Sequence, residues 1–202
     1  MNRPTTLTDL SPADRHRAVA AGFTREVAAV TDWDVPTPVD GWVARDIVEH
    51  LISWFTGFLH AGGHNLPPGP DAATEPAAAW RAHVDGVQAL LDNSSADSEF
   101  RHPMVGAHRL ADAVDQFYTA DVFMHTWDLS AATGHAPLMD PQYATQLLCG
   151  MAGIEELLRS SGQYGPAVAV PADADPVTRL AGFIGRDPSW TPDATTTNSG
   201  RT

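Results

Sequence analysis

The sequence predicts an all-α fold, a four-helix bundle with additional helices toward the C-terminus. Apolar residues recur at intervals of three and four along several long stretches, which is the period of an amphipathic α-helix. Only the short segment PAVAVP, residues 166–171, is typical of a β-strand, and one strand cannot define a sheet. Four long helices in one domain indicate a bundle, with the remaining residues packed on its outside.

The first two helices are expected at residues 11–30 and at about 42–59. The first begins with Ser11 as its N-cap and Pro12 at its first helical position, which is a common helix start. The segment TDWDVPTPVDG ends the helical pattern, because its two prolines and its glycine favour a turn or a loop. The second helix then carries an apolar stripe along one face.

The third and fourth helices are expected at about 77–91 and about 109–132. A loop rich in glycine and proline, GGHNLPPGPDAATEP, precedes the third, and the polar connection DNSSADSEFRHPMVG follows it. The fourth helix stops at Gly134, a residue type that is favoured just after a helix end.

A fifth helix at residues 141–159 and a short last helix at about 177–184 complete the pattern. We expect Cys149 on the fifth helix to be a small buried apolar residue rather than a nucleophile. Residues 9–190 are assigned to one helical domain. Residues 191–202 are expected to be a disordered tail, because almost none of them is apolar.

Composition disfavours several functional classes. The net charge is −13, all twelve cationic residues are arginine, and they form no basic patch, so a nucleic-acid backbone would be repelled. No segment has the glycine spacing of a dinucleotide or P-loop site. The single cysteine allows no intramolecular disulfide, and neither a signal peptide nor an apolar run of about 18 residues is present. We therefore expect a cytoplasmic protein that binds neither membranes nor nucleic acids.

Three polar residues fall inside the apolar stripes of two helices. His50 follows the spacing of the second helix stripe, and Asp121 and His125 follow that of the fourth. A lone buried carboxylate is costly unless it is paired, protonated or coordinated, and no arginine lies on either stripe. Two imidazoles and a carboxylate that project inward from facing helices can hold a divalent metal. We interpret His50, Asp121 and His125 as candidate metal ligands.

Alternatives stay open at these positions. A histidine on an apolar face is more often a core residue, and Asp121 could bond His125 directly without a metal. His16 could be a fourth ligand, although a capping or core role is favoured. Asp128 could orient a ligand or accept a proton, or it could cap the helix or pair with an arginine. The remaining histidines are assigned no role, and His83 is expected to lie off the apolar stripe of its helix.

Three segments in order resemble one family. DWDVPTPVDGWVARDIVEHL is similar to the start of the metal-binding domain of mycothiol-dependent maleylpyruvate isomerases, in the DinB/YfiT-like superfamily. TADVFMHTWDLSAATG resembles the second signature of that group. GPAVAVPADADPVTRLAGFIGRDPSW is similar to the C-terminal segment of a single-domain branch. The resemblance implies a DinB-like four-helix bundle over about residues 9–190.

The resemblance also implies a ligand set. The family's histidine in its "xxHL" motif, and its acidic residue and histidine four apart, match His50, Asp121 and His125. The isomerases have glutamate where this chain has Asp121, which is one methylene shorter. They also carry a separate C-terminal domain that helps to form the thiol and substrate site, whereas this chain ends soon after the bundle. The isomerase substrate is therefore not carried over.

These observations lead to a functional hypothesis with two rivals. We expect a metal- and thiol-dependent transferase or isomerase that acts on a small electrophilic molecule, with zinc or nickel as the metal and mycothiol or a similar thiol as the co-substrate. The first rival is a non-catalytic metal-binding or stress-related module. The second is a plain interaction bundle without a metal. A homodimer is an option that the sequence leaves open.

The histidine ligands predict a pH dependence of metal binding. An imidazole must be neutral to bind a metal, so metal occupancy should fall as the pH drops below about 6. Metal content measured after equilibration over a series of pH values checks this expectation. Occupancy that is unchanged at about pH 5 would contradict ligation by histidine.

Overall fold

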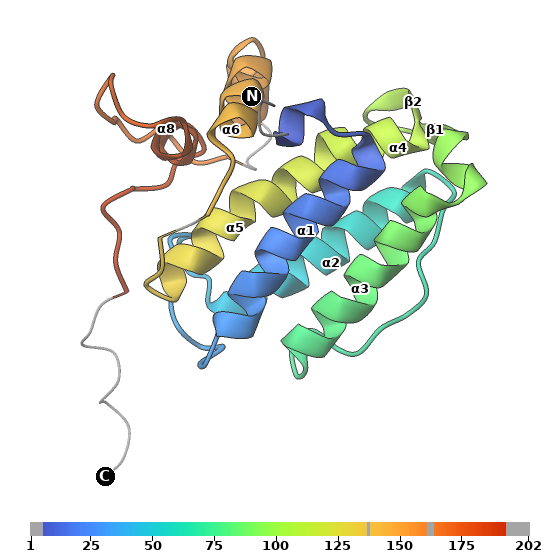
Figure 1. The fold of residues 1–202 in the computed structure, drawn as a ribbon, viewed down its shortest axis with the longest axis horizontal. Helices are drawn as coiled ribbons and strands as arrows, with labels where there is room; N and C mark the ends of the chain where they lie inside the picture. Colours follow the sequence, from blue (N-terminus) through green and yellow to red (C-terminus); the bar gives the residue numbers. More distant parts are fainter. Residues whose placement is uncertain (1–5, 137, 161–163, 193–202) are drawn as a thin grey trace, which may run out of the picture.

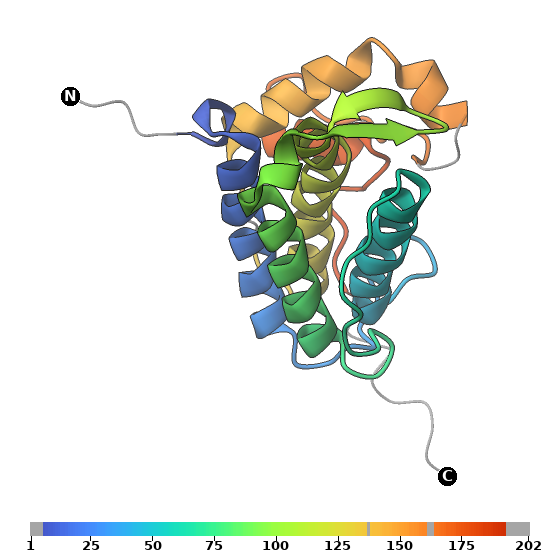
Figure 2. The ribbon, with the colours of Figure 1, turned by 90° about the vertical axis from the view of Figure 1, so that its right-hand side faces the viewer.

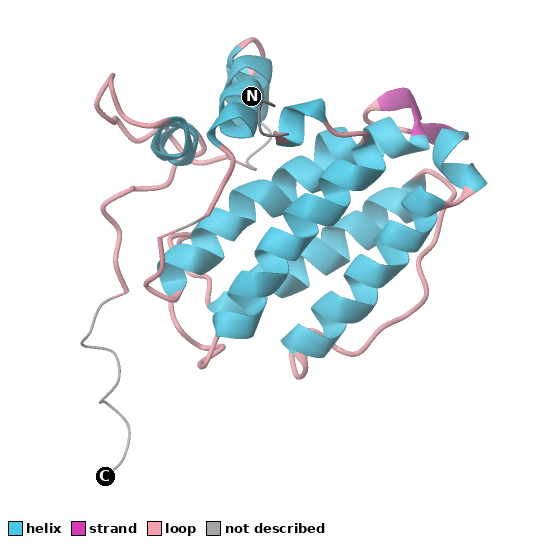
Figure 3. Ribbon diagram, in the orientation of Figure 1, coloured by secondary structure: helices cyan, strands magenta, loops and turns pink. Residues whose placement is uncertain are grey.

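The computed structural model describes residues 6–136, 138–160 and 164–192, and over these residues the chain is mostly helical, as predicted (Figure 3). The longest helices are α1 (Pro12–Ala29), α2 (Ala44–Ala61), α3 (Pro76–Asp92) and α5 (Ala120–Ala132). The shorter helices are η1 (Leu7–Asp9), η2 (Ser94–Asp97), α4 (Leu110–Ala113), η3 (Val114–Thr119), α6 (Pro141–Ala152), α7 (Glu155–Ser160) and α8 (Pro176–Phe183). Two strands, β1 (Glu99–His102) and β2 (Gly106–Arg109), form an antiparallel hairpin.

Four helices lie alongside one another and enclose the main hydrophobic core (Figures 1 and 2). Helix α1 contacts α3 and α5, and α2 contacts the same two helices from the other side. We call α1, α2, α3 and α5 the helical core. Their inward faces bury large side chains completely, among them Phe23, Phe55, Trp80 and Leu129.

The expected helix starts and ends are close to those observed. Ser11 accepts a hydrogen bond from the backbone of Asp14 at 3.2 Å, and Pro12 is the first residue of α1. This cap satisfies one of the N–H groups that have no partner within the helix. Helix α5 ends before Gly134, which adopts a positive φ of 74°. Glycine adopts this conformation without steric strain, which explains the residue type at this position.

The sequence does not predict the hairpin, most of which lies within the expected polar connection DNSSADSEFRHPMVG. Strand β1 has four residues, of which only Phe100 is buried. A strand this short shows no clear alternation of apolar and polar residues. The turn depends on Gly106, whose φ of 82° favours glycine. Residues 166–171, which have a strand-like pattern but are too short to define a sheet alone, form no strand.

Three further expectations needed correction. The fourth predicted helix contains a wide π-helical turn, η3, between α4 and α5. The fifth is interrupted at Gly153, which separates α6 from α7. Cys149 is exposed rather than buried, because α6 buries only Tyr143 and Ala144. Most of the expected disordered tail, residues 193–202, lies outside the described residues.

The C-terminal segment, residues 164–192, contains α8, and α8 packs against α6 (Figure 1). A Cβ on Gly182 would lie 2.8 Å from the carbonyl oxygen of Val168, so the close approach requires glycine there. The backbone N–H of Val168 donates to the carbonyl of Gly182 at 2.9 Å. Among the described residues, none of the helices has the length and apolar character that a membrane-spanning segment needs.

The packing of α2 against the hairpin predicts opposite effects for two glycine-to-alanine changes. A Cβ on Gly62 would lie 1.9 Å from the buried ring of Phe100, so Gly62→Ala should destabilise the protein by about 1–3 kcal/mol. Gly57 is exposed within α2 and a Cβ there meets nothing within 4 Å. Gly57→Ala should therefore stabilise by about 0.5–1 kcal/mol. Denaturant unfolding of both variants checks the pair, and equal effects would contradict the Phe100 contact.

Candidate metal centre

Helices α2 and α5 bring the three predicted ligands together. His50 projects from α2, and Asp121 and His125 project from α5 one helical turn apart. One ligand atom from each residue lies within 4.8 Å of the other two. The Nε2 atom of His50 is 3.4 Å from one oxygen of Asp121, and the Nε2 atom of His125 is 3.7 Å from the other.

These separations fit the coordination of one ion. The 3.7 Å distance between His125 and Asp121 is too long for a hydrogen bond. Two donors that each lie about 2.0–2.1 Å from a tetrahedral ion are themselves about 3.3 Å apart. Two imidazole nitrogens and a carboxylate oxygen suit zinc, nickel, iron(II) or manganese. His50, Asp121 and His125 could therefore hold a divalent metal ion.

A second carboxylate orients His125. The Nδ1 atom of His125 is 2.8 Å from an oxygen of Asp128, which is fully buried. An ionised carboxylate only accepts hydrogen bonds, so Nδ1 carries the proton and Nε2 presents its lone pair toward Asp121. Metal-binding histidines commonly have such a partner, which fixes the ring and raises its basicity.

Asp128 is in turn paired with Arg186 from the C-terminal segment. The Nε atom of Arg186 donates to one oxygen of Asp128 at 2.8 Å, and Nη2 donates to the other at 3.1 Å. Of the four roles left open for Asp128, orienting a candidate ligand and pairing with an arginine are therefore present. Sequence reasoning missed Arg186 because it lies beyond α8, off both helix stripes. The signal in the sequence was Asp128 itself, because a carboxylate on an apolar stripe needs a cationic partner.

Asp121 also has a partner outside the ligand set. The indole Nε1 of Trp54 donates to an oxygen of Asp121 at 2.9 Å. Trp54 lies one turn after His50 on α2, so the same helix supplies a ligand and the group that holds a second ligand. The orientation of all three candidate ligands therefore depends on the packing of α2 against α5.

Electrostatics within the centre favour an added positive charge. Burial alone would raise the pKa of Asp121, but the His125 and His50 imidazoles and the Trp54 N–H outweigh it and hold that pKa below its usual value. Burial alone would lower the pKa of His125, yet Asp121 and Asp128 raise it. The carboxylates thus stay ionised and attract either a proton on His125 or a metal cation.

The centre opens toward solvent on the side of His50. The His50 side chain is 33% exposed, that of Asp121 is 19% exposed and that of His125 is 7% exposed. Trp42 lies against two of the ligands, with its ring 5.0 Å from that of His50 and 6.0 Å from that of His125. A small molecule that reaches the centre would therefore pass His50 and the ring of Trp42.

Two other histidines lie elsewhere in the helical core. His16 is buried and its Nδ1 pairs with the amide oxygen of Gln88 at 2.9 Å, so it has the core role rather than that of a fourth ligand. His83 is also buried, contrary to the expectation that it lies off the apolar stripe. It faces inward between Phe55, Trp80 and Tyr118.

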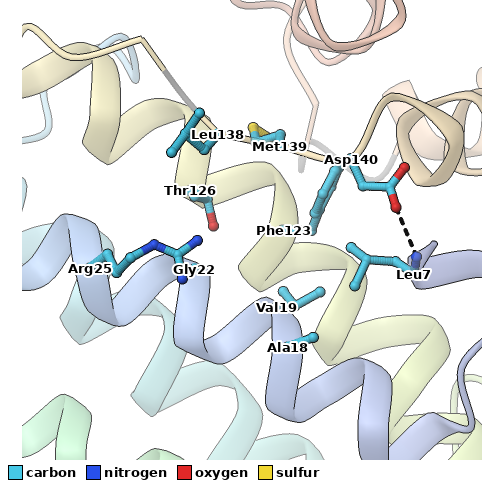
Figure 4. Close-up of a pocket in the computed structure, with 10 residues that line it drawn as sticks. All are labelled: Leu7, Ala18, Val19, Gly22, Arg25, Phe123, Thr126, Leu138, Met139 and Asp140. Carbon is cyan, nitrogen blue, oxygen red and sulfur yellow. Dashed lines mark hydrogen bonds between the residues drawn. The ribbon is translucent and has the colours of Figure 1, made fainter. Parts of the chain in front are cut away.

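A separate hollow of about 190 Å³ lies between α1, α5 and the segment before α6 (Figure 4). Its polar residues include Arg25, Thr126 and Asp140. The carboxylate of Asp140 has a structural role, because it accepts a hydrogen bond from the backbone N–H of Leu7 and caps α6. None of the three candidate metal ligands lines this hollow.

Comparison with known proteins identified two relatives. An uncharacterized protein of Mycobacterium tuberculosis (strain CDC 1551 / Oshkosh) is 29% identical over 161 residues, covering 75% of this chain and 83% of the relative. An uncharacterized protein of Mycobacterium tuberculosis (strain ATCC 25618 / H37Rv) gives the same values. No family model matches the chain, and no solved structure matches it. The function must therefore be argued from the site.

The link from Arg186 to His125 predicts a loss of metal affinity in Arg186→Met. This change leaves the buried Asp128 without its cation, so the carboxylate no longer holds His125 in place. Loss of such an outer partner lowers metal affinity by about 10–100-fold. Metal titration of the folded variants checks this, with Arg179→Met on the exposed face of α8 as the control. Equal affinities for the two variants would contradict the link.

Proposed function

We propose that this protein is a divalent-metal-dependent enzyme with a DinB-like four-helix bundle, formed by the helical core. The single observation that carries the proposal is the convergence of His50, Asp121 and His125 from two facing helices. Three protein ligands leave open positions on an ion, which is the pattern of a catalytic site rather than a closed structural one. The arrangement of the four core helices supports the family resemblance of the sequence.

The proposed reaction is a thiol-dependent transfer or isomerisation of a small electrophilic molecule. A bound zinc or nickel ion supplies a positive charge that lowers the pKa of a coordinated thiol. Mycothiol or a similar low-molecular-weight thiol is the proposed co-substrate, and its thiolate is the nucleophile. The protein acts alone or as a homodimer in this proposal, in the cytoplasm.

The residues around the centre have distinct roles in the proposal. Asp128 keeps the proton of the neutral His125 ring on Nδ1, so Nε2 is the nitrogen that can bind the metal. Trp54 fixes the Asp121 carboxylate. Burial and the charge of Asp121 raise the pKa of Tyr164 to about 12, so its hydroxyl stays protonated.

Metal analysis of the purified protein tests the proposal. The wild type should contain near one equivalent of a transition metal, and the Asp121→Ala/His125→Ala variant should contain none, because two of three ligands are lost. The control removes another histidine and aspartate four residues apart in sequence, in His108→Ala/Asp112→Ala, which lie in β2 and α4 outside the ligand cluster. This control should keep its metal.

Thiol-dependent turnover then separates an enzyme from a metal-binding module. The metal-loaded wild type should consume a small electrophile only when a thiol is present, and the double variant should not. Metal binding without turnover for any thiol would favour the non-catalytic or stress-related module. No metal in the wild type, even after reconstitution, would contradict both.

A further inference from the structure

A second group of buried polar residues lies in the helical core. His16 on α1, His83 on α3 and Tyr118 on η3 come from three different elements. The ring of Tyr118 is 5.9 Å from that of His16 and 5.5 Å from that of His83. His16 and Tyr118 are completely buried, and His83 is nearly so. We call these three residues the inner cluster.

Each residue of the inner cluster has a buried polar atom without a hydrogen-bond partner among the described residues. These atoms are Nε2 of His16, Nε2 of His83 and the hydroxyl of Tyr118. Buried polar groups in folded proteins are nearly always hydrogen-bonded to protein or to ordered water, so three such atoms on neighbouring rings call for a partner.

The hydrogen bond of His16 fixes what that partner must offer. The amide oxygen of Gln88 accepts from Nδ1 of His16 at 2.9 Å, while the amide nitrogen of Gln88 donates to Asp92 at 2.9 Å. Nδ1 of His16 therefore carries the proton, and Nε2 is a bare acceptor. The missing partner must donate a hydrogen bond to His16.

The inner cluster is uncharged. Burial lowers the pKa of His16 and of His83 to about 4, so both imidazoles are neutral near pH 7. Burial also holds the pKa of Tyr118 well above its usual value, so its hydroxyl keeps its proton. No carboxylate belongs to the cluster, and a bare cation in this apolar interior would be strongly disfavoured.

We propose that the inner cluster is an internal binding site for one small neutral hydrogen-bonding molecule, water. Water can accept from the Tyr118 hydroxyl and donate to Nε2 of His16. It has one further donor and one further acceptor position, so it can bond Nε2 of His83 in either tautomer of that ring. One ordered molecule of this kind satisfies all three atoms, as buried waters with about three hydrogen bonds do.

Two surroundings give this site a role. On one side His83 lines a hollow of about 300 Å³ between α2, α3 and residues 66–70, which brings solvent close to the cluster. On the other side Tyr118 stacks on Phe55 with the ring centres 3.8 Å apart, and lies 6.1 Å from Trp54. Trp54 holds Asp121. The bound water therefore holds the ring of Tyr118 in place. That ring lies beside Trp54, which in turn holds the candidate ligand Asp121.

The sign of one stability change tests the site. Tyr118→Phe removes only the hydroxyl and keeps the ring. If the hydroxyl bonds an internal water, the midpoint of thermal unfolding should fall by about 2–4 °C. If the hydroxyl has no partner, removing it should raise the midpoint, and the proposal fails.

A double-mutant cycle tests the shared partner. The effects of Tyr118→Phe and His16→Leu should be non-additive, because both groups bond the same molecule. The control cycle pairs Tyr118→Phe with His60→Leu, at an exposed histidine near the end of α2, and should be additive. Additive effects in the first cycle would overturn the proposal.

Two direct measurements complete the test. A high-resolution crystal structure should show one ordered water within hydrogen-bond distance of His16, His83 and Tyr118, and an empty interior there would contradict the proposal. The Asp121→Ala/His125→Ala variant should contain no metal. A metal found in that variant, and lost when His16→Leu is added, is the contrary result. Such a metal would mean that the inner cluster binds a cation instead.

Discussion

The ion pair between Arg186 and the fully buried Asp128 is the constraint on which the candidate metal centre depends. A carboxylate that has left water needs a charged partner in good geometry, because an unpaired buried charge costs about 3–5 kcal/mol. Here the two oxygens of Asp128 are divided between Arg186 and His125. The same carboxylate therefore secures the C-terminal segment and sets the orientation of a candidate ligand.

The helical core contains two polar clusters of opposite electrostatic character. The ligand cluster combines ionised carboxylates with imidazoles, so it attracts positive charge. The inner cluster has two imidazoles with lowered pKa values and a neutral phenol. Tyr118 and Asp121 are three residues apart on the η3–α5 run, so one continuous helix serves both. Both clusters are buried, but Asp121 and Asp128 outweigh burial at His125, whereas burial dominates at His16 and His83.

The parts of this structure that depend on local periodicity could be predicted from the sequence. The helix stripes identified His50, Asp121 and His125, and the structure brings all three together, because residues on the stripes of two adjacent helices face the same interior. The resemblance added the same three residues. The parts that depend on contacts distant in sequence could not be predicted. Arg186 reaches Asp128 from outside any stripe, and Phe100 in the hairpin packs over Gly62.

The long sequence separation of Arg186 and Asp128 has a consequence for the order of folding. They lie 58 residues apart, and a ribosome adds residues from the N-terminus onward at about 5–20 per second. Helices α2 and α5 are both complete before Arg186 is synthesised. The nascent protein thus passes through a stage in which Asp128 has no cation, and docking of the C-terminal segment ends that stage. The orientation of His125 in the candidate metal centre is therefore tied to synthesis of the C-terminal segment.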